Sequence, residues 1–179
     1  MEAISCIKTR RSIRAFDTDK KVPHELIEEV IEAASFAPSW KNTQVTRYIV
    51  LEGDAKEKLA ACTNIWAKNG DIMRNAPMVV ALTVVEKRSG YERDGSFSTP
   101  KGSGWQMFDC GIASEAFCLA AHEKGLGTVI LGLYDDNASE VIGVPEGQEL
   151  VALIPVGFPA ESPEAPKRKS VADLVSYRE

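Results

Sequence analysis

Two clusters of positively charged side chains stand near opposite ends of the chain. Their members are Arg10, Arg11, Arg14, Lys167, Arg168 and Lys169. Guanidinium groups bind phosphate through planar, charge-assisted hydrogen bonds, and Ser12 places a hydroxyl within the first cluster. If folding brings the two clusters together, they make a phosphate site. If it does not, each is a solvated basic face.

The overall composition makes these local clusters informative. The 179 residues include 21 Lys and Arg against 26 Asp and Glu, which gives a formal net charge of −5. The overall field therefore repels phosphate, and this argues against nucleic acid as a partner. A bound phosphate must be held by a local cluster instead.

Several other chemistries lack the residues that they need. The four cysteines form no C-x-x-C pair and only two histidines accompany them, so we expect no metal site. Gly125 and Gly127 begin a dinucleotide fingerprint, but Ile130 stands where the third glycine is needed. His24 and His122 lie near helix ends, where exposed histidine is common, so the sequence does not indicate a nucleophilic triad.

The chain also lacks the apolar segments that membranes require. No run approaches the ~20 apolar residues needed to span a bilayer. The first residues lack the basic start and long apolar stretch of a secretory signal. We therefore expect a cytoplasmic protein without a membrane partner.

The pattern of apolar residues predicts alternating helices and strands. Helices are expected over 3–9, from Pro23 to about Ala37, after Asp54, around Trp66 and Met73, over 105–124 and over 138–142. Strands are expected over 48–51, 78–85, 128–131 and 150–156. Because the helix over 105–124 is apolar most of the way round, it should pack centrally on the sheet. These elements indicate a single α+β domain over 1–179.

Two segments fall outside the predicted elements. Residues 86–104 collect glycine, serine and charged residues, which is typical of a mobile loop. Residues 160–179 form a C-terminal tail that is rich in proline and then basic.

Motifs across nearly the whole chain resemble the FMN-dependent nitroreductase family. They are the segments 10–16, 37–44, 109–113, 125–127, 130–132 and 155–159, followed by Lys167 and Arg168. The likeness runs from about residue 4 to 176 and is weak only over 60–105. It implies a central mixed, mostly antiparallel sheet of four or more strands packed by helices, and a homodimer with FMN at the subunit interface.

The resemblance also implies which residues contact FMN. The phosphate, ribityl chain and pyrimidine edge would be held by Arg10, Arg11, Ser12 and Arg14, with Lys167 and Arg168 closing over the phosphate. The flavin ring would contact Asn69, Ile130, Leu131, Gly132 and Leu133. The other subunit would contribute Pro38, Ser39 and Asn42. Arg14 and the Gly132 N–H would tune the flavin, so no separate catalytic residue is needed.

The implied activity is transfer of hydride from NADH or NADPH to FMN and then to a nitroaromatic, quinone or other electron-poor acceptor, in a ping-pong cycle. Trp40, Tyr91 and Phe97 are candidate contacts for the acceptor. Trp40 stands where the family has serine, Val45-Thr46 replaces Pro-Trp, and Ile72 replaces a lysine. Two alternatives remain open: a flavin-binding carrier or sensor without turnover, and a specialised reductase of one enone or halogenated ring.

Overall fold

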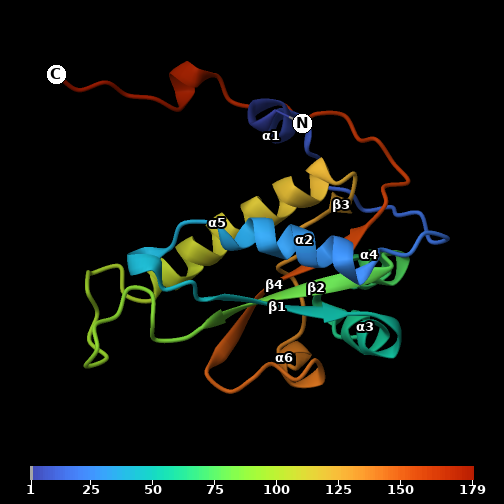
Figure 1. The fold of residues 1–179 in the computed structure, drawn as a ribbon, viewed down its shortest axis with the longest axis horizontal. Helices are drawn as coiled ribbons and strands as arrows, with labels where there is room; N and C mark the ends of the chain where they lie inside the picture. The colour runs from blue at the N-terminus through green and yellow to red at the C-terminus, as the bar shows by residue number, and fades with distance from the viewer. Residues whose placement is uncertain (1) are drawn as a thin grey trace.

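A four-stranded antiparallel sheet forms the centre of the molecule (Figure 1). The computed structural model describes residues 2–179. The sheet has the order β1-β2-β4-β3, with β1 at Thr46–Leu51, β2 at Met78–Val85, β3 at Gly127–Thr128 and β4 at Gln148–Gly157. An isolated parallel bridge joins Ser12 to Thr128 beside β3. The predicted fold class, a mostly antiparallel α+β sheet packed by helices, is confirmed.

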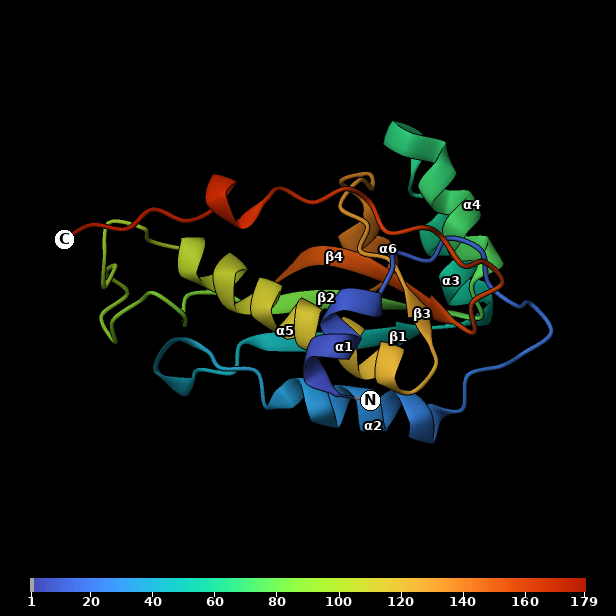
Figure 2. The same ribbon diagram turned by 90° about the horizontal axis from the view of Figure 1, so that it is seen from above.

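Helices cover both faces of this sheet (Figures 1 and 2). The helices are α1 at Ala3–Thr9, α2 at His24–Ser35, α3 at Gly53–Ala60, α4 at Ala67–Asn75, α5 at Gly104–Glu123 and α6 at Ala138–Val141. Short 3-10 turns are η1 at Trp40–Asn42, η2 at Asn64–Trp66 and η3 at Val171–Asp173. Helices α2 and α5 pack on one face, and α3, α4 and α6 pack on the other.

Strand β2 shows why both faces must be covered. Its side chains alternate between the two apolar cores: Met78 and Val80 pack with α2 and α5, whereas Val79 and Ala81 pack with α3 and α4. All four are fully buried. The continuous apolar run over 78–85 is therefore the sequence of a strand that is buried on both sides.

Two local predictions differ from the structure. The strand expected over 128–131 ends at Thr128, and the chain meets β4 again only where Leu131 bridges Leu153. Ile130 lies between these two points and is 47% exposed. The apolar run in the sequence is longer than the part of the backbone that pairs with β4. The helix expected after Asp54 begins at Gly53, so Asp54 lies inside the first turn of α3, and the N-cap Glu52 forms no side-chain hydrogen bond with the helix.

The segment predicted as a mobile loop, 86–104, contains turns and a bridge between Tyr91 and Phe97. The rings of these two residues lie 4.9 Å apart. Phe97 also packs against the backbone of Gly102, where an added Cβ would come within 3.2 Å of the ring. The mobility of this segment stays a prediction.

Phe117 of α5 is fully buried and stacks on Tyr48 of β1 with ring centroids 5.7 Å apart. We expect Phe117→Ala to lower the free energy of unfolding by about 3–5 kcal/mol, because it leaves a cavity between helix and sheet. Urea denaturation followed by circular dichroism measures this. The control is Phe36→Ala, since Phe36 is 83% exposed and its loss should change stability by less than about 0.5 kcal/mol. Equal effects of the two substitutions would contradict this account of the core.

Candidate functional site

Folding brings the two clusters of positive side chains together. They line one hollow of about 450 Å³, whose wall consists of Arg10, Arg11, Ser12, Arg14, Pro163, Glu164, Pro166 and Arg168. Lys167, next along the tail, is exposed and is not part of this wall. Members of both clusters, about 150 residues apart in sequence, thus share one concave site.

Backbone hydrogen bonds hold the start of the tail against residues 13–16. The amide of Ile13 donates to the Thr128 carbonyl at 2.9 Å, which places this segment on the edge of β3. The amide of Ala160 donates to the Ala15 carbonyl at 2.9 Å. The Glu161 carboxylate accepts the amides of both Arg14 and Ala15. These bonds fix the position of the tail just before its basic residues.

Arg10 has unused hydrogen-bonding capacity in this hollow. Its Nε is buried and has no hydrogen-bond partner within residues 2–179, and the Glu115 carboxylate lies 3.8 Å away. Arg11 donates to the carbonyls of Lys8 and Arg10, both at 2.8 Å. A buried charged donor without an acceptor is costly. The site is therefore suited to an anion that accepts from Arg10.

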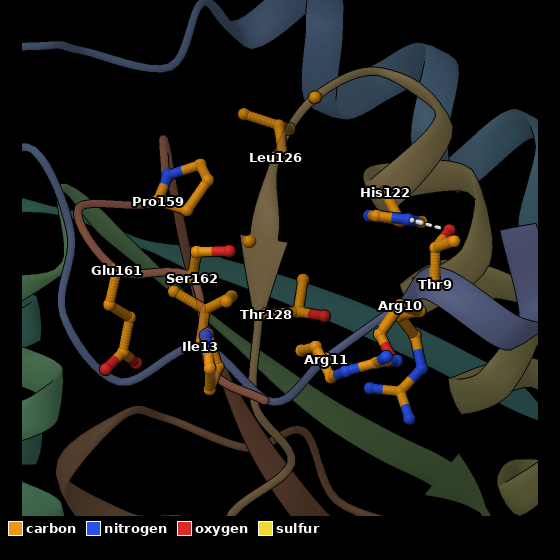
Figure 3. A pocket seen from close by; sticks show the side chains of 13 residues that line it. Thr9, Arg10, Arg11, Ile13, His122, Leu126, Thr128, Pro159, Glu161 and Ser162 are labelled. Carbon is orange, nitrogen blue, oxygen red and sulfur yellow. Dashed lines mark hydrogen bonds between the residues drawn. The ribbon is translucent and has the colours of Figure 1, made fainter. Parts of the chain in front are cut away.

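A second hollow, of about 340 Å³, shares Arg10 and Arg11 with the first (Figure 3). His122 of α5 lines it and shares a hydrogen bond of 2.9 Å with Thr9. Burial and the nearby Arg10 and Arg11 lower the pKa of His122. Both effects favour the neutral form of the His122 imidazole.

The segment 130–133 is anchored on both sides of Gly132. Leu131 exchanges two backbone hydrogen bonds with Leu153, at 2.8 and 2.9 Å. The Asn69 amide donates to the Leu133 carbonyl at 2.9 Å, so Asn69 acts on this segment from α4. Leu131 itself is buried and both of its backbone polar groups are paired, so it supports the segment and offers no free polar group to a ligand.

Gly132, between the hydrogen-bonded residues Leu131 and Leu133, is exposed. Its N–H has no hydrogen-bond partner in the described part of the chain, and an added Cβ would meet nothing within 4 Å. No neighbouring protein atom requires a glycine here. The open space beside the backbone could instead receive a ligand.

Asp135 is a supporting residue that the sequence reasoning missed. Its carboxylate accepts the amides of Asn64 and Ile65, at 3.0 and 3.1 Å, and the Asn64 side chain at 2.8 Å. These hydrogen bonds lower the pKa of Asp135. They also tie η2 to the loop after Leu133. An acidic residue before a helix resembles an ordinary cap, so no sequence signal identified this role.

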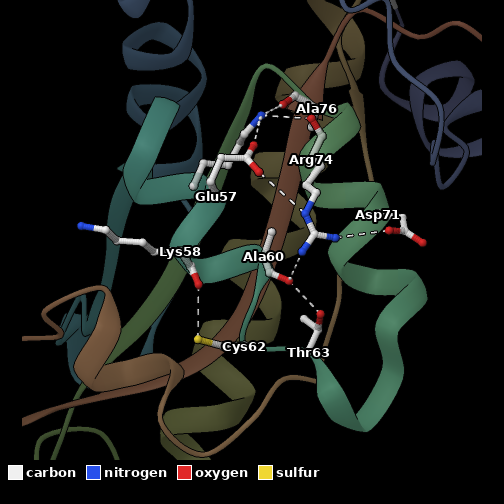
Figure 4. A network of polar contacts seen from close by, with 9 residues as sticks. Glu57, Lys58, Ala60, Cys62, Thr63, Asp71, Arg74 and Ala76 are labelled. Carbon is white, nitrogen blue, oxygen red and sulfur yellow. Dashed lines mark hydrogen bonds and ion pairs between the residues drawn. The ribbon is translucent and has the colours of Figure 1, made fainter.

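A polar network joins α3 to α4, the helix that carries Asn69 (Figure 4). The buried Lys56 donates to the carbonyls of Arg74 and Ala76, at 3.1 and 2.7 Å. Arg74 also reaches Glu57 and Asp71. A Cβ on Gly70 would lie 2.6 Å from the Ala60 carbonyl oxygen, so the helices approach closely beside Asn69.

Pro38, Ser39 and Asn42 lie apart from the cationic hollow. They flank or belong to η1, and the Trp40 amide of η1 donates to Asp109 of α5. His122, which lies beside the hollow, is about 20 Å away from Asp109 along the same helix. The Ser39 hydroxyl accepts the Gln44 amide at 2.9 Å. Within one chain, the residues predicted to contact FMN thus form separate groups.

The η1 loop is strained and held by a buried carboxylate. Lys41, Asn42 and Gln44 have positive φ angles of 45°, 54° and 48°. Asp109, 3% exposed, accepts the Trp40 amide at 2.9 Å and the Ser89 hydroxyl at 2.5 Å. Strain of this kind persists only where the surroundings enforce it and concentrates at functional sites.

The described residues contain no group of three or more His, Cys, Asp or Glu that could hold a metal ion. All four cysteines are free and buried. Burial raises the pKa of the Cys110 thiol to about 11, which keeps it protonated at neutral pH. Within residues 2–179, no helix has the length and hydropathy to cross a membrane.

Comparisons with known proteins place this arrangement in a family. A sequence model described as the nitroreductase family matches residues 7–66 and 61–158. A Methanothermobacter thermautotrophicus protein, whose name includes NAD(P)H nitroreductase, is 32% identical over 168 residues, covering 91% of this chain and 80% of its own. The chain belongs to the nitroreductase family, and the predicted resemblance is confirmed.

Solved structures agree with this assignment. A nitroreductase family protein from Clostridium novyi has a TM-score of 0.77 and 30% identity, covering 93% of this chain and 89% of its own. A nitroreductase-like structure from Desulfovibrio desulfuricans, solved in complex with FMN, has a TM-score of 0.78 and 27% identity. It covers 98% of this chain and 96% of its own. A Bacillus subtilis relative named FMN reductase [NAD(P)H] is 29% identical over 189 residues, covering 99% of this chain and 74% of its own.

Proposed function

We propose that this chain is an FMN-dependent oxidoreductase that uses NADH or NADPH to reduce nitroaromatic, quinone or related electron-poor acceptors. The observation that carries the proposal is the single hollow shared by Arg10 and Arg168. Family membership, the names of the relatives and the FMN complex of a structural neighbour support it. Four buried free thiols and a reduced nicotinamide donor fit the cytoplasm as its place of action.

The cationic hollow fits the phosphate end of FMN. Arg10, Arg11, Ser12 and Arg168 line it, and the guanidinium of Arg10, whose Nε has no hydrogen-bond partner, would donate to a phosphate oxygen. Lys167 adds positive charge from the exposed side of the tail. Because phosphate accepts bidentate, charge-assisted hydrogen bonds, these residues would bind it despite the acidic composition of the whole chain.

The segment 130–133 fits the ring end. The exposed Gly132 backbone leaves space for a flat group, and its free N–H is a donor to a ring nitrogen. Ile130 and Leu133 are about half exposed and would cover apolar ring surface. Asn69 would orient the segment through the Leu133 carbonyl. Arg14, also exposed, would stabilise negative charge at the pyrimidine edge.

Bound FMN would supply the hydride chemistry, and the chain would bind, orient and tune it. Donor and acceptor would use the same face in turn, which is a ping-pong cycle.

We further propose that the working unit is a homodimer, in which Pro38, Ser39 and Asn42 come from the second copy. An open apolar groove of about 630 Å³ runs along α5. Its lining residues are Met107, Phe108, Gly111, Ile112, Glu115, Ala116 and Leu119. A second copy packed on this groove would bury it and bring the η1 loop of one chain toward the hollow of the other.

Replacing Arg10 and Arg168 together by Ala should weaken FMN binding roughly 100-fold or more, because two charged hydrogen-bond donors to the phosphate are lost. Fluorescence titration of the flavin-free protein with FMN measures the effect. The double substitution Lys21→Ala and Lys58→Ala removes the same charge from exposed positions and should leave affinity unchanged. Equal FMN affinity in both double variants would refute the phosphate assignment.

The substitution Gly111→Arg tests the dimer. Gly111 is exposed on α5 and an added Cβ meets nothing within its own chain, so the monomer should fold normally. We expect the variant to sediment as a monomer and to lose FMN. Ala55→Arg, at an exposed position of α3, should do neither. A Gly111→Arg monomer that keeps tightly bound FMN would rule out a site shared between subunits.

Anaerobic mixing tests turnover. NADH or NADPH should bleach the flavin absorbance of the purified protein rapidly, and a quinone or nitroaromatic should restore it. A flavin that stays oxidised would favour the carrier or sensor. Bleaching that is reversed only by an enone or a halogenated ring would favour the specialised reductase.

A further inference from the structure

We propose that Trp40, Trp105 and Phe108 form a binding platform for flat aromatic acceptors that carry an acidic group, with Lys101 recognising that group. The assignment of these ligands as acceptors rests on the proposed function. The binding itself depends only on residues of this chain. Trp105, Phe108 and Lys101 were not among the residues that the sequence singled out for the acceptor.

The three rings form one continuous aromatic surface. The centroids of Trp40 and Trp105 are 4.6 Å apart, and those of Trp105 and Phe108 are 5.6 Å apart in an edge-to-face arrangement. A hollow of about 450 Å³ lies against this surface and is lined by Lys101, Gly104, Trp105 and Phe108. This volume suits a small molecule, and electron-rich indole rings stack well on an electron-poor aromatic ring.

Phe108 lines both this hollow and the apolar groove along α5 on which a second copy would pack. Its side chain is 59% exposed although it touches Trp105. A flat ligand seated on Trp105 would cover part of this apolar surface. Within one chain, Trp105 thus forms the wall of the platform and Phe108 its rim.

The charges around the hollow favour an anionic ligand. Lys101 is exposed and forms no ion pair within the described residues. The neighbouring Lys41 is paired with Glu92 at 3.0 Å and lies 5.7 Å from the ring centroid of Trp40. No acidic residue occurs in the first turn of α5. Lys101 is thus the free cation at this hollow in the described part of the chain.

The platform is held in place before any ligand binds. The buried Asp109 carboxylate accepts the amide of Trp40 and the hydroxyl of Ser89, which joins the η1 loop to the segment before α5. Asp109 does not line the hollow, so its charge is used for positioning. The Trp105 indole donates to the Thr99 hydroxyl at 2.8 Å, which fixes the second ring. Such preorganisation lowers the entropic cost of binding a rigid ligand.

Quenching of tryptophan fluorescence tests the proposal directly. The purified protein, with whatever flavin it carries, is titrated with 4-nitrobenzoate and with the neutral 4-nitrobenzamide, which has nearly the same shape. We expect the acid to bind about two- to fivefold more tightly, as befits one exposed ion pair. This preference should shrink as salt is raised.

Two variants separate the roles of charge and rings. Lys101→Met should abolish the preference for the acid and leave the affinity for the amide unchanged, whereas the control Lys58→Met should keep the preference. Trp105→Leu should weaken binding of both compounds. If Trp105→Leu does not fold, the exposed Lys101 variant still decides the question.

Equal affinity for acid and amide in the native protein, or a preference that survives Lys101→Met, would overturn the proposal. Failure of the proposed function has a different signature. In that case the protein would show no flavin bleaching by NADH or NADPH, yet the two nitro compounds would still be distinguished by quenching. A working reductase that makes no such distinction would refute the platform alone.

Discussion

The junction between the two ends of the chain is the constraint on which the candidate site depends. Arg10, Arg11, Arg14 and Arg168 are like charges, and bringing them together is unfavourable unless other interactions enforce it. The enforcing interactions are two backbone bridges, of Ser12 to Thr128 and of Phe16 to Pro159, and the carboxylate of Glu161, which accepts the amides of Arg14 and Ala15. The fold therefore maintains a local excess of positive charge in an acidic protein. An anion would relieve the repulsion, which is the physical basis for a phosphate site.

The central sheet explains why the candidate site residues lie outside strands β1 to β4. Its two middle strands are covered by apolar helices on both faces, so β2 and β4 have almost no side chain free for chemistry. Polar and charged groups of the candidate sites therefore lie at the edge beside β3, in loops and on helices. This arrangement gives rigid support to the Gly132 segment, because Leu131 is paired with β4 while Asn69 and Asp135 hold the residues around Leu133.

Helix α5 separates two candidate regions along its length. One end, near His122, borders the cationic hollows, and the other carries Trp105, Phe108 and the carboxylate that holds the η1 loop. In a single chain these regions cannot act on one ligand, because the helix keeps them about 20 Å apart. The apolar groove along the same helix offers the physical link, since a second copy packed there would bring the two regions of different chains together. Binding of the cofactor, dimerisation and binding of the acceptor would thus all involve α5.

The sequence by itself determined much of the architecture. The periodicity of apolar residues predicted the helices and three of the four strands. A helix that buries one face and a strand that is buried on both faces each have a characteristic apolar pattern. The motifs around 10–16 and 37–44 pointed to the family that the comparisons confirm. The tertiary structure alone decided that Arg10 and Arg168 share a hollow, that Lys167 does not line it, and that β3 ends at Thr128. It also revealed the roles of Asp135 and Asp109, since each carboxylate binds amides or hydroxyls far away in sequence. Such long-range contacts follow from the packing of the whole chain, and no local pattern of residues encodes them.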